Sequence, residues 1–341
     1  MYATKGSPSA IAMMSNPSIS AKTLGIIILN YRTPQLTIDC LRSLAGQVDP
    51  QSHQVIVVDN ASGDESVSMI QGAIEQEQWQ GWAQVLPSEV NGGFAAGNNL
   101  GIQAIQADVY WLLNSDIIVR PDALNRLLKT LQENPQVGLI SPRLEWPDGT
   151  PQISCFRFHS PASELIAGAA TSVITKLFQA FNVPIEVSDR PSFPQWTSFA
   201  SVMIRREVFE QIGLLDDGYF MYYEDVDFCR RAGQAGWQIM NFPEAKVVHL
   251  RGGSSSTKQD IATRKRPRAY LYQSRSRYFA KFYSQVGLIG VNCCWFFGRS
   301  IALMREKVGN KQPHTCLQQE QDIWLNWRNP LQTANLNTPK D

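Results

Sequence analysis

The sequence GIIILNY, residues 25–31, decides the fold class. Five apolar residues of strand length, Gly25–Leu29, end at the polar pair Asn30-Tyr31, and apolar residues at helical spacing follow over Gln35–Leu44. Outward from this stretch the same order of strand and helix recurs. The further strands that we expect are Gln54–Val58, Trp82–Leu86 and Val109–Leu113, and the further helices are Gly63–Gln78, Asn98–Ala107 and Pro121–Gln132. Apolar strands separated by helices predict an α/β domain with a mostly parallel central sheet, covered by helices on both faces.

The second half of the sequence is less regular. The expected strands are Ser198–Arg205 and Ala245–His249, and the expected helices are Glu207–Gly213, Asp225–Ala235 and Arg264–Tyr283. These patterns divide the chain into four regions. Residues 1–22 are predicted to be a disordered leader rather than a signal peptide, 23–257 an α/β domain, 258–308 a basic and apolar helical extension, and 309–341 a loosely ordered polar tail.

Composition argues against several classes of function. With 43% hydrophobic and 18% charged residues the chain has a globular composition, and its net charge of +1 argues against nucleic acid as a partner. The six cysteines form no Cys-x-x-Cys pair and indicate neither a zinc site nor a disulfide framework. Scattered cysteines of this kind favour a reducing, cytoplasmic compartment.

Polar residues follow three of the expected strands, at the edge where such sheets bind their ligands. Asp59 can accept a hydrogen bond from the imide of a pyrimidine base, while the backbone near Asn30-Tyr31 holds the other edge of the base. Asp116, in the turn Asn114-Ser115-Asp116, can hold a hard divalent cation that also binds two phosphates. For both carboxylates the alternative interpretation is a cap on the next helix or turn.

The run NGGFAAGNNLG, residues 91–101, is rich in small residues that let a backbone approach a ligand closely. It is not a dinucleotide fingerprint, because its glycines are Gly92-Gly93 and then Gly97, and it is not a Walker loop, because no Gly-Lys-Ser/Thr follows. A glycine-rich turn that precedes a helix starting at Asn98 is the alternative interpretation.

Two stretches of the second half carry titratable groups. Residues 222–227 (YYEDVD) contain three carboxylates, whose repulsion can make one of them a general base, or which can stabilise a helix N-terminus. His249 ends a strand and can bind a metal through a neutral imidazole nitrogen, with a structural histidine as the alternative. Arg251 and Ser254 follow it and can contact phosphate oxygens.

The extension after residue 258 has a basic part and an apolar part. The basic part, up to Arg277, can hold a diphosphate, a lipid phosphate or nucleic acid, or can be a solvated helix face; the low net charge argues against nucleic acid. The apolar part, Val286–Met304, approaches the length of a membrane span, but Asn292 and Arg299 interrupt it. We therefore favour an interfacial or core-packing helix over a spanning one.

Taken in order, these motifs resemble the GT-A glycosyltransferases of family 2, especially their rhamnosyltransferase-like branch. The resemblance rests on IIILNYRTPQLTIDCLRSL, VIVVDNASGDES, NGGFAAGNNLGI, WLLNSDIIV, WTSFASVMIRREVFEQIGLLDDGYFMYYEDVDFCRRAGQAGW and VVHLRGGS, between Leu24 and Ser255. It implies a GT-A fold, a Rossmann-like sheet flanked by helices, with a C-terminal helical extension.

The resemblance also implies a role for individual residues. Asp225 matches the general base, and Asp116 and His249 match the ligands of a divalent metal, Mg or Mn. The donor nucleotide and sugar are expected to contact Asn30, Tyr31, Asp59, Gly93, Phe94, Asn98, Asn114, Ser115, Asp116 and Trp196, and the acceptor or phosphate to contact Glu224, Arg251 and Ser254. Asn114 stands where the family's metal motif begins with aspartate, which leaves fewer carboxylate ligands.

The implied function is inverting transfer of a sugar from a nucleoside-diphosphate donor to a hydroxyl of a saccharide or lipid-linked saccharide. The branch suggests dTDP-rhamnose, polysaccharide or cell-envelope glycan synthesis, and a cytoplasmic enzyme in peripheral contact with the inner face of the membrane. A catalytically silent sugar-nucleotide or glycan-binding module is the alternative. A sugar nucleotidyltransferase would need a glycine-rich loop with a basic residue after the first strand, where this chain has Asn-Tyr-Arg-Thr-Pro.

Overall fold

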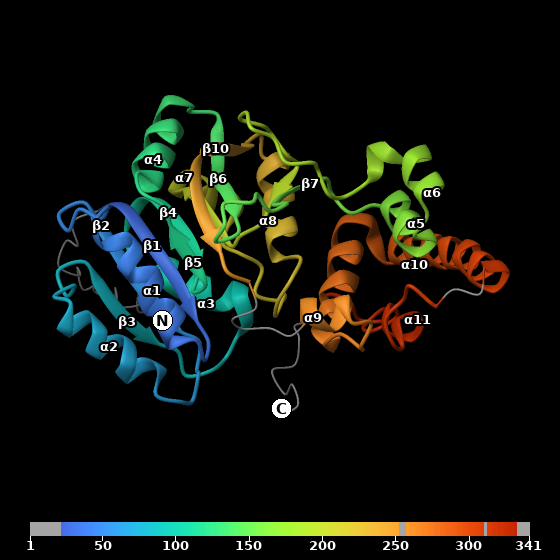
Figure 1. The fold of residues 1–341 in the computed structure, drawn as a ribbon, viewed down its shortest axis with the longest axis horizontal. Helices are drawn as coiled ribbons and strands as arrows, with labels where there is room; N and C mark the ends of the chain where they lie inside the picture. The colour runs from blue at the N-terminus through green and yellow to red at the C-terminus, as the bar shows by residue number, and fades with distance from the viewer. Residues whose placement is uncertain (1–21, 252–256, 310–311, 333–341) are drawn as a thin grey trace, which may run out of the picture.

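The structure is a computed structural model that describes residues 22–251, 257–309 and 312–332. It has two lobes, which Figure 1 shows side by side. The larger lobe is a twisted sheet with helices on both faces. The smaller lobe contains helices from the middle and from the end of the chain.

The first half of the sheet is parallel and follows the predicted alternation. Its strands are β1 (Lys22–Asn30), β2 (His53–Asp59), β3 (Ala83–Pro87) and β4 (Ala107–Asn114), in the spatial order β3-β2-β1-β4. The helices between them are α1 (Pro34–Ala45), α2 (Ser66–Gln76) and α3 (Gly93–Ala104). The register pairs Asn30 with Asp59, so the carboxyl ends of β1 and β2 meet at one edge.

The second half of the sheet is mixed rather than parallel. It contains β9 (Ser201–Arg205), β6 (Val137–Glu145), β10 (Gln238–His249) and β5 (Ile117–Val119). Strand β9 is antiparallel to both β4 and β6, β10 is parallel to β6, and β5 is antiparallel to β10. The sequence pattern did not predict β6, in which Pro142 and Arg143 interrupt the apolar run, and it predicted only the last residues of β10.

Alternate side chains of the strands divide the core of this lobe into two layers. Leu24, Ile26 and Ile28 of β1 pack against α1, α2 and α4 (Ala123–Glu133), whereas Ile27 packs against the opposite layer. That layer contains α3, α7 (Arg206–Ile212) and α8 (Glu224–Gln234). Each fully buried isoleucine contributes roughly 1.5–3 kcal/mol, so the strand register is strongly specified.

The smaller lobe joins two distant parts of the sequence. Helices α5 (Pro161–Ala169) and α6 (Ser172–Leu177), with the turn η1 (Gln179–Phe181), lie between the short strands β7 (Cys155–Phe156) and β8 (Trp196–Thr197). Helix α5 packs on α10 (Ala269–Gly309), which has a non-helical residue at Ser284 with φ 67°. At the crossing, a Cβ on Gly168 would lie 2.2 Å from the Trp295 carbonyl oxygen, and one on Gly298 would lie 2.3 Å from that of Leu165.

The remaining elements close this lobe. Helix α9 (Thr257–Ala262) precedes α10, and α11 (Gln319–Asp322) follows it. The Arg266 guanidinium donates two hydrogen bonds of 2.9 Å to Asp322, and Ile323 is buried against α10. The prediction of a loosely ordered tail is therefore wrong for residues 312–332, because Ile323 and its neighbours pack against the buried side of α10. The predicted leader lies outside the described residues, apart from Lys22.

Candidate active site

The ends of β1 and β2 form a buried polar cluster. The Asn30 side-chain amide donates to the Asp59 carboxylate (2.7 Å), which also accepts bonds from the Ser62 hydroxyl (2.6 Å) and backbone N–H (3.0 Å). Asp59 is buried, and a carboxylate has about four acceptor positions, so one position is left on Oδ2. Tyr31 lies beside this cluster, with the Arg32 guanidinium 5.1 Å from the centre of its ring.

A threonine that the sequence patterns did not single out joins this cluster to the end of β4. The Thr33 hydroxyl contacts the side-chain oxygen of Asn30 (3.2 Å) and the hydroxyl of Ser115 (2.9 Å). The Asn114 backbone N–H donates to the carbonyl of Ala200, the residue before β9, which fixes the start of the Asn-Ser-Asp turn. The predicted donor residues at these three strand ends are therefore close together.

Asp116 and His249 also lie together, at the end of β10. The register of β10 and β5 pairs His249 with Ile117, and His249 Nε2 lies 3.5 Å from Asp116 Oδ1. Both side chains are buried, and the other imidazole nitrogen, Nδ1, has no hydrogen-bond partner among the described residues. A carboxylate oxygen beside a buried imidazole nitrogen is a donor set that suits a divalent cation.

Arg251 continues this edge of the sheet. Its guanidinium donates to the side-chain oxygen of Gln152 (2.5 Å), and the Gln152 amide donates to the His249 carbonyl (2.8 Å). Burial lowers the pKa of Arg251, and the nearby Asp116 carboxylate partly offsets this effect. A cationic side chain is thus held close to the Asp116–His249 pair. Ser254, the other predicted phosphate contact, lies outside the described residues.

The glycine-rich run has a different structure from the predicted one. Helix α3 already begins at Gly93 and not at Asn98, so most of the run is helical. Gly97 and Gly101 let α3 approach β1, because a Cβ at Gly97 would lie 2.4 Å from the Leu29 side chain. Gly93 has φ +84°, and a Cβ there would lie 1.9 Å from the Phe220 carbonyl oxygen.

Two buried asparagines border Gly93. The Asn60 amide donates to the Gly93 carbonyl (3.1 Å), and the Asn98 amide donates to the Phe94 carbonyl (2.9 Å). The side-chain oxygens of Asn60 and Asn98 are buried without a hydrogen-bond partner among the described residues. Buried polar atoms are normally satisfied, so both oxygens are candidates for ligand contact. Asn98 was predicted, whereas Asn60 was not, although it directly follows Asp59.

The three carboxylates at the start of α8 differ in their surroundings. Asp227 is fully buried and forms ion pairs with Arg231 and Lys281, both at 2.6 Å. Glu224 is also buried, and burial followed by repulsion from Asp225 raises its pKa well above the ordinary value. Only Asp225 of these three is partly exposed to solvent. The three carboxylates thus differ in their surroundings: Asp227 is ion-paired, Glu224 keeps its proton to a higher pH, and Asp225 is accessible to solvent.

Residues 222–227, which contain the three carboxylates and are called the acid segment below, are linked to the end of β2 through the start of α3. The Phe94 backbone N–H donates to the Phe220 carbonyl (2.8 Å), four residues before Glu224, and Asn60 bonds to Gly93 from the other side. Tyr222 and Tyr223 both have positive φ, 70° and 68°. Non-glycine residues in this region cost free energy and cluster at functional sites, where surrounding contacts hold them.

Trp196 is buried among aromatic rings, one of which also contacts Tyr223. Its ring stacks on Phe156 (4.1 Å between centroids) and lies near His159 (6.2 Å), and its indole N–H donates to the Arg157 carbonyl (2.8 Å). His159 in turn lies 5.0 Å from the ring of Tyr223. The structure thus shows Trp196 as a buried support, and its contact with a donor stays a prediction.

Comparison with known proteins identifies this arrangement. A solved structure with a similar fold is the mannosyltransferase PcManGT from Pyrobaculum calidifontis in complex with GDP-Man and Mn²⁺, with a TM-score of 0.54 and 15% identity over 87% of this chain and 78% of that one. The fold and the edge of polar residues define a glycosyltransferase of the GT-A type. The chain belongs to glycosyl transferase family 2, whose family model matches residues 25–213.

Curated relatives agree with this assignment. The N-acetylglucosaminyl-diphospho-decaprenol L-rhamnosyltransferase of Mycobacterium tuberculosis is 30% identical over 219 residues, which are 59% of this chain and 67% of the relative. The low-salt glycan biosynthesis hexosyltransferase Agl10 of Haloferax volcanii is 26% identical over 66% of each chain. The predictions of the fold class, the family and a glycosyltransferase activity in glycan synthesis are confirmed.

Proposed function

We propose that this glycosyltransferase moves rhamnose from dTDP-rhamnose to a hydroxyl of a saccharide or lipid-linked saccharide, with inversion at the anomeric carbon. The activities of relatives support the donor: besides the mycobacterial enzyme they include the rhamnosyltransferase WbbL of Escherichia coli and the dTDP-rhamnosyl transferase RfbF of Shigella flexneri. The remaining acceptor position on buried Asp59, beside the Asn30 amide, suits the imide N–H of a thymine or uracil base.

The observation that carries the proposal is the difference in burial and ion pairing among the three carboxylates at the start of α8. Asp225 is the accessible one, so it is assigned as the general base that removes the proton of the acceptor hydroxyl. Glu224 keeps its proton to a higher pH because it is buried, and can donate a hydrogen bond to the acceptor. Attack by the deprotonating hydroxyl on the anomeric carbon releases the nucleoside diphosphate in one displacement.

Asp116 and His249 would hold a divalent cation, Mn or Mg. A bound cation would neutralise the charge that develops on the leaving diphosphate. The described residues contain no group of three or more His, Cys, Asp or Glu that could hold a metal, so other ligands would come from donor phosphates or water. Arg251, held by Gln152, lies where it can contact the same phosphates.

The test is release of nucleoside diphosphate from dTDP-rhamnose in the presence of Mn²⁺ and candidate acceptors. Asp225→Asn is expected to lower kcat by about 10²–10⁴-fold, the usual contribution of a general base. Asp217→Asn is the matched control, because Asp217 is exposed on the preceding loop. Unchanged turnover in Asp225→Asn would refute the base. Donor binding without any turnover in the wild type would favour the silent binding module.

Nucleobase choice is tested separately by thermal shift. Selective binding to the folded state raises the unfolding temperature. We expect dTDP or UDP to stabilise the protein, and Asp59→Asn to weaken that stabilisation. A preference for purine nucleoside diphosphates would contradict the role given to Asp59.

Membrane contact is a further part of the proposal, and two exposed apolar stripes support it. Val286, Phe297, Met304 and Val308 repeat on one face of α10, and Val173, Leu177 and Phe181 repeat every fourth residue along α6 and η1. Residues 257–332 contain thirteen Lys or Arg and only four Asp or Glu. Three of the basic residues, Arg275, Arg277 and Lys281, pair with carboxylates elsewhere in the chain, and the excess that is left favours an anionic surface.

Helix α10 is long and apolar enough to cross a membrane. Within its most apolar window, 39% of the residues are already buried in the protein, and Ser284 breaks the helix. The buried share of this window and the break at Ser284 favour a helix that packs on the protein and lies on a bilayer over one that crosses it. We infer peripheral attachment at the cytoplasmic face of the membrane.

Vesicle sedimentation tests this attachment. The wild type is expected to sediment with phosphatidylglycerol vesicles more than with phosphatidylcholine vesicles, and Phe297→Ser with Met304→Ser to reduce this binding. Val90→Ser with Phe193→Ser is the control, since these exposed apolar residues lie outside both stripes. Equal sedimentation of the two double variants would contradict the assignment. Full resistance of membrane-bound protein to carbonate would instead indicate a spanning helix.

A further inference from the structure

The first half of α10 faces the acid segment with a single stripe of side chains. One face of the helix contains residues at positions i, i+4, i+7, i+8 and i+11, which are Tyr270, Ser274, Arg277, Tyr278 and Lys281. This part of the chain lies beyond the residues that the family model matches, 25–213. From the sequence, the basic residues of this part could form a phosphate site or a solvated helix face. In the structure, Arg277 and Lys281 instead pair with carboxylates of the same chain, Asp216 and Asp227.

The stripe holds both ends of the segment 216–227. Arg277 donates to both oxygens of Asp216, at 2.7 and 3.2 Å. The Lys281 ammonium lies 2.7 Å from Asp216 and 2.6 Å from Asp227, and so bridges the start of the loop and the first turn of α8. In Figure 1 this part of α10 lies between the helices of the smaller lobe and α8.

The stripe also contacts the middle of the segment. The Ser274 hydroxyl donates to the Met221 carbonyl at 3.0 Å, and the Tyr278 ring lies 5.4 Å from that of Tyr223. Gly218 makes room for the guanidinium, because a Cβ there would lie 2.1 Å from Arg277 Cζ. Contact therefore reaches the loop from its start to the residue before Glu224.

These contacts from α10 account for the unusual backbone conformation of Tyr222 and Tyr223. Tyr222 and Tyr223 are both in the left-handed region, which costs on the order of 1 kcal/mol for each residue and persists only where neighbours fix it. Asp216 is firmly ionised: burial would raise its pKa, but hydrogen bonds from Arg277 and Lys281 outweigh that effect and lower it to about 2. The Asp216 carboxylate is therefore ionised, as its ion pairs with Arg277 and Lys281 require, at neutral and moderately acidic pH.

We propose that Lys281 is a positioning residue for catalysis, which holds the accessible carboxylate of Asp225 in place by bridging Asp216 and Asp227. The C-terminal helix is then part of the catalytic apparatus and not only an attachment device. This inference rests on the proposed role of Asp225. Loss of the bridge leaves each carboxylate with another cation, Arg277 for Asp216 and Arg231 for Asp227, so the fold survives while the loop loosens.

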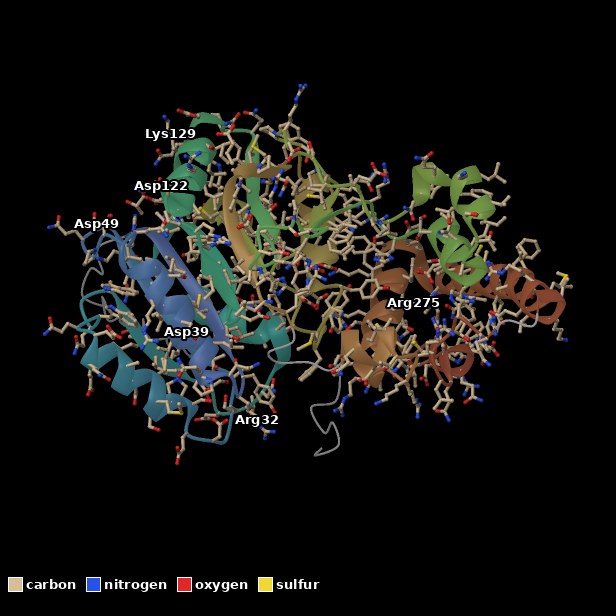
Figure 2. The ribbon with its side chains drawn as sticks, viewed as in Figure 1. Arg32, Asp39, Asp49, Asp122, Lys129 and Arg275 are labelled. Atoms are coloured by element: carbon tan, nitrogen blue, oxygen red, sulfur yellow. The ribbon has the colours of Figure 1, made fainter. Side chains whose placement is uncertain are left out.

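The experiment compares Lys281→Met, Lys281→Arg and Lys129→Met in the full chain. Lys129 is the matched control, because it is an exposed lysine on α4, and Figure 2 shows it far from Arg275 and the smaller lobe. Lys281→Met is expected to lower kcat about tenfold or more with the donor KM within about twofold, since small displacements of a reacting group are costly. Lys281→Arg is expected to restore most of the loss, and Lys129→Met to have no effect.

Unchanged kcat in Lys281→Met would overturn the proposal, as would a fall in kcat that matches a fall in the folded fraction at the assay temperature. If Lys281→Met does not fold, Ser274→Ala removes one hydrogen bond to the loop and is expected to lower kcat about 2–10-fold; an unchanged kcat there overturns the proposal too. Failure of the base assignment is seen separately, because Asp225→Asn would then keep full turnover.

Discussion

Replacement of Gly93 by alanine tests how the donor edge and the acid segment are joined. The added Cβ would lie 1.9 Å from the Phe220 carbonyl oxygen and 2.6 Å from its carbon, and both are backbone atoms that a side-chain rotation cannot move. The positive φ of +84° costs about 1–2 kcal/mol for alanine. Relief of the clash costs about 1–3 kcal/mol, and the loss of the bond from Phe94 to Phe220 costs about 1 kcal/mol. We expect a total loss of about 3–6 kcal/mol in the free energy of unfolding.

Two other glycines separate these contributions. Gly63 has φ +68° with no atom within 4 Å of an added Cβ, so Gly63→Ala is expected to show the backbone cost alone, about 1–2 kcal/mol. Gly46 has a negative φ and no atom within 4 Å of an added Cβ. The free energy of unfolding of Gly46→Ala is therefore expected to stay within about 0.5 kcal/mol of the wild-type value. The assay is urea-induced unfolding followed by tryptophan fluorescence at 25 °C. A Gly93→Ala protein no less stable than Gly63→Ala would refute the reasoning.

Three further predictions concern pH, helix packing and the cation. Burial, opposed by Glu164, lowers the pKa of His159 to about 4 from 6.5. The unfolded chain therefore binds a proton that the folded chain refuses, and stability present above pH 6.5 falls by up to about 3 kcal/mol as the pH drops to 4. Urea unfolding across this range should show a smaller fall in His159→Phe. Gly298→Ala should destabilise by about 1–3 kcal/mol through its clash with α5, whereas Gly290→Ala, with open space around it, should stabilise by roughly 0.5–1 kcal/mol in thermal unfolding. EDTA should abolish dTDP-rhamnose turnover and Mn²⁺ restore it, and Asp116→Asn should raise the Mn²⁺ concentration needed for half-maximal rate.

The parts of the fold that could be predicted are those with a local signal. Strands β1, β2 and β4 are continuous apolar runs that end in polar residues, so both the strands and their ligand-binding edge could be read from the sequence. Strand β6 could not, because Pro142 and Arg143 break the pattern, and its place in the sheet depends on pairing with β9 and β10.

The candidate site divides in the same way. Asp116 and His249 were predicted from their positions at strand ends, and a strand register brings them together. The roles of Glu224, Asp225 and Asp227 could not be separated by spacing, since all three lie within four residues. What separates them is burial and the position of Lys281, which lies 65 residues beyond Asp216 in the sequence and reaches these carboxylates only in the folded chain.

The crossing of α5 and α10 has a consequence for synthesis on the ribosome. The Glu164 carboxylate is buried against Arg275, which follows it by 111 residues. At translation rates of about 5–20 residues per second, α5 waits roughly 6–20 s for its partner. During that interval the Glu164 carboxylate and the close-packing surface at Gly168 lack their partners on α10, so the nascent chain exposes this face of α5 until α10 has been synthesised.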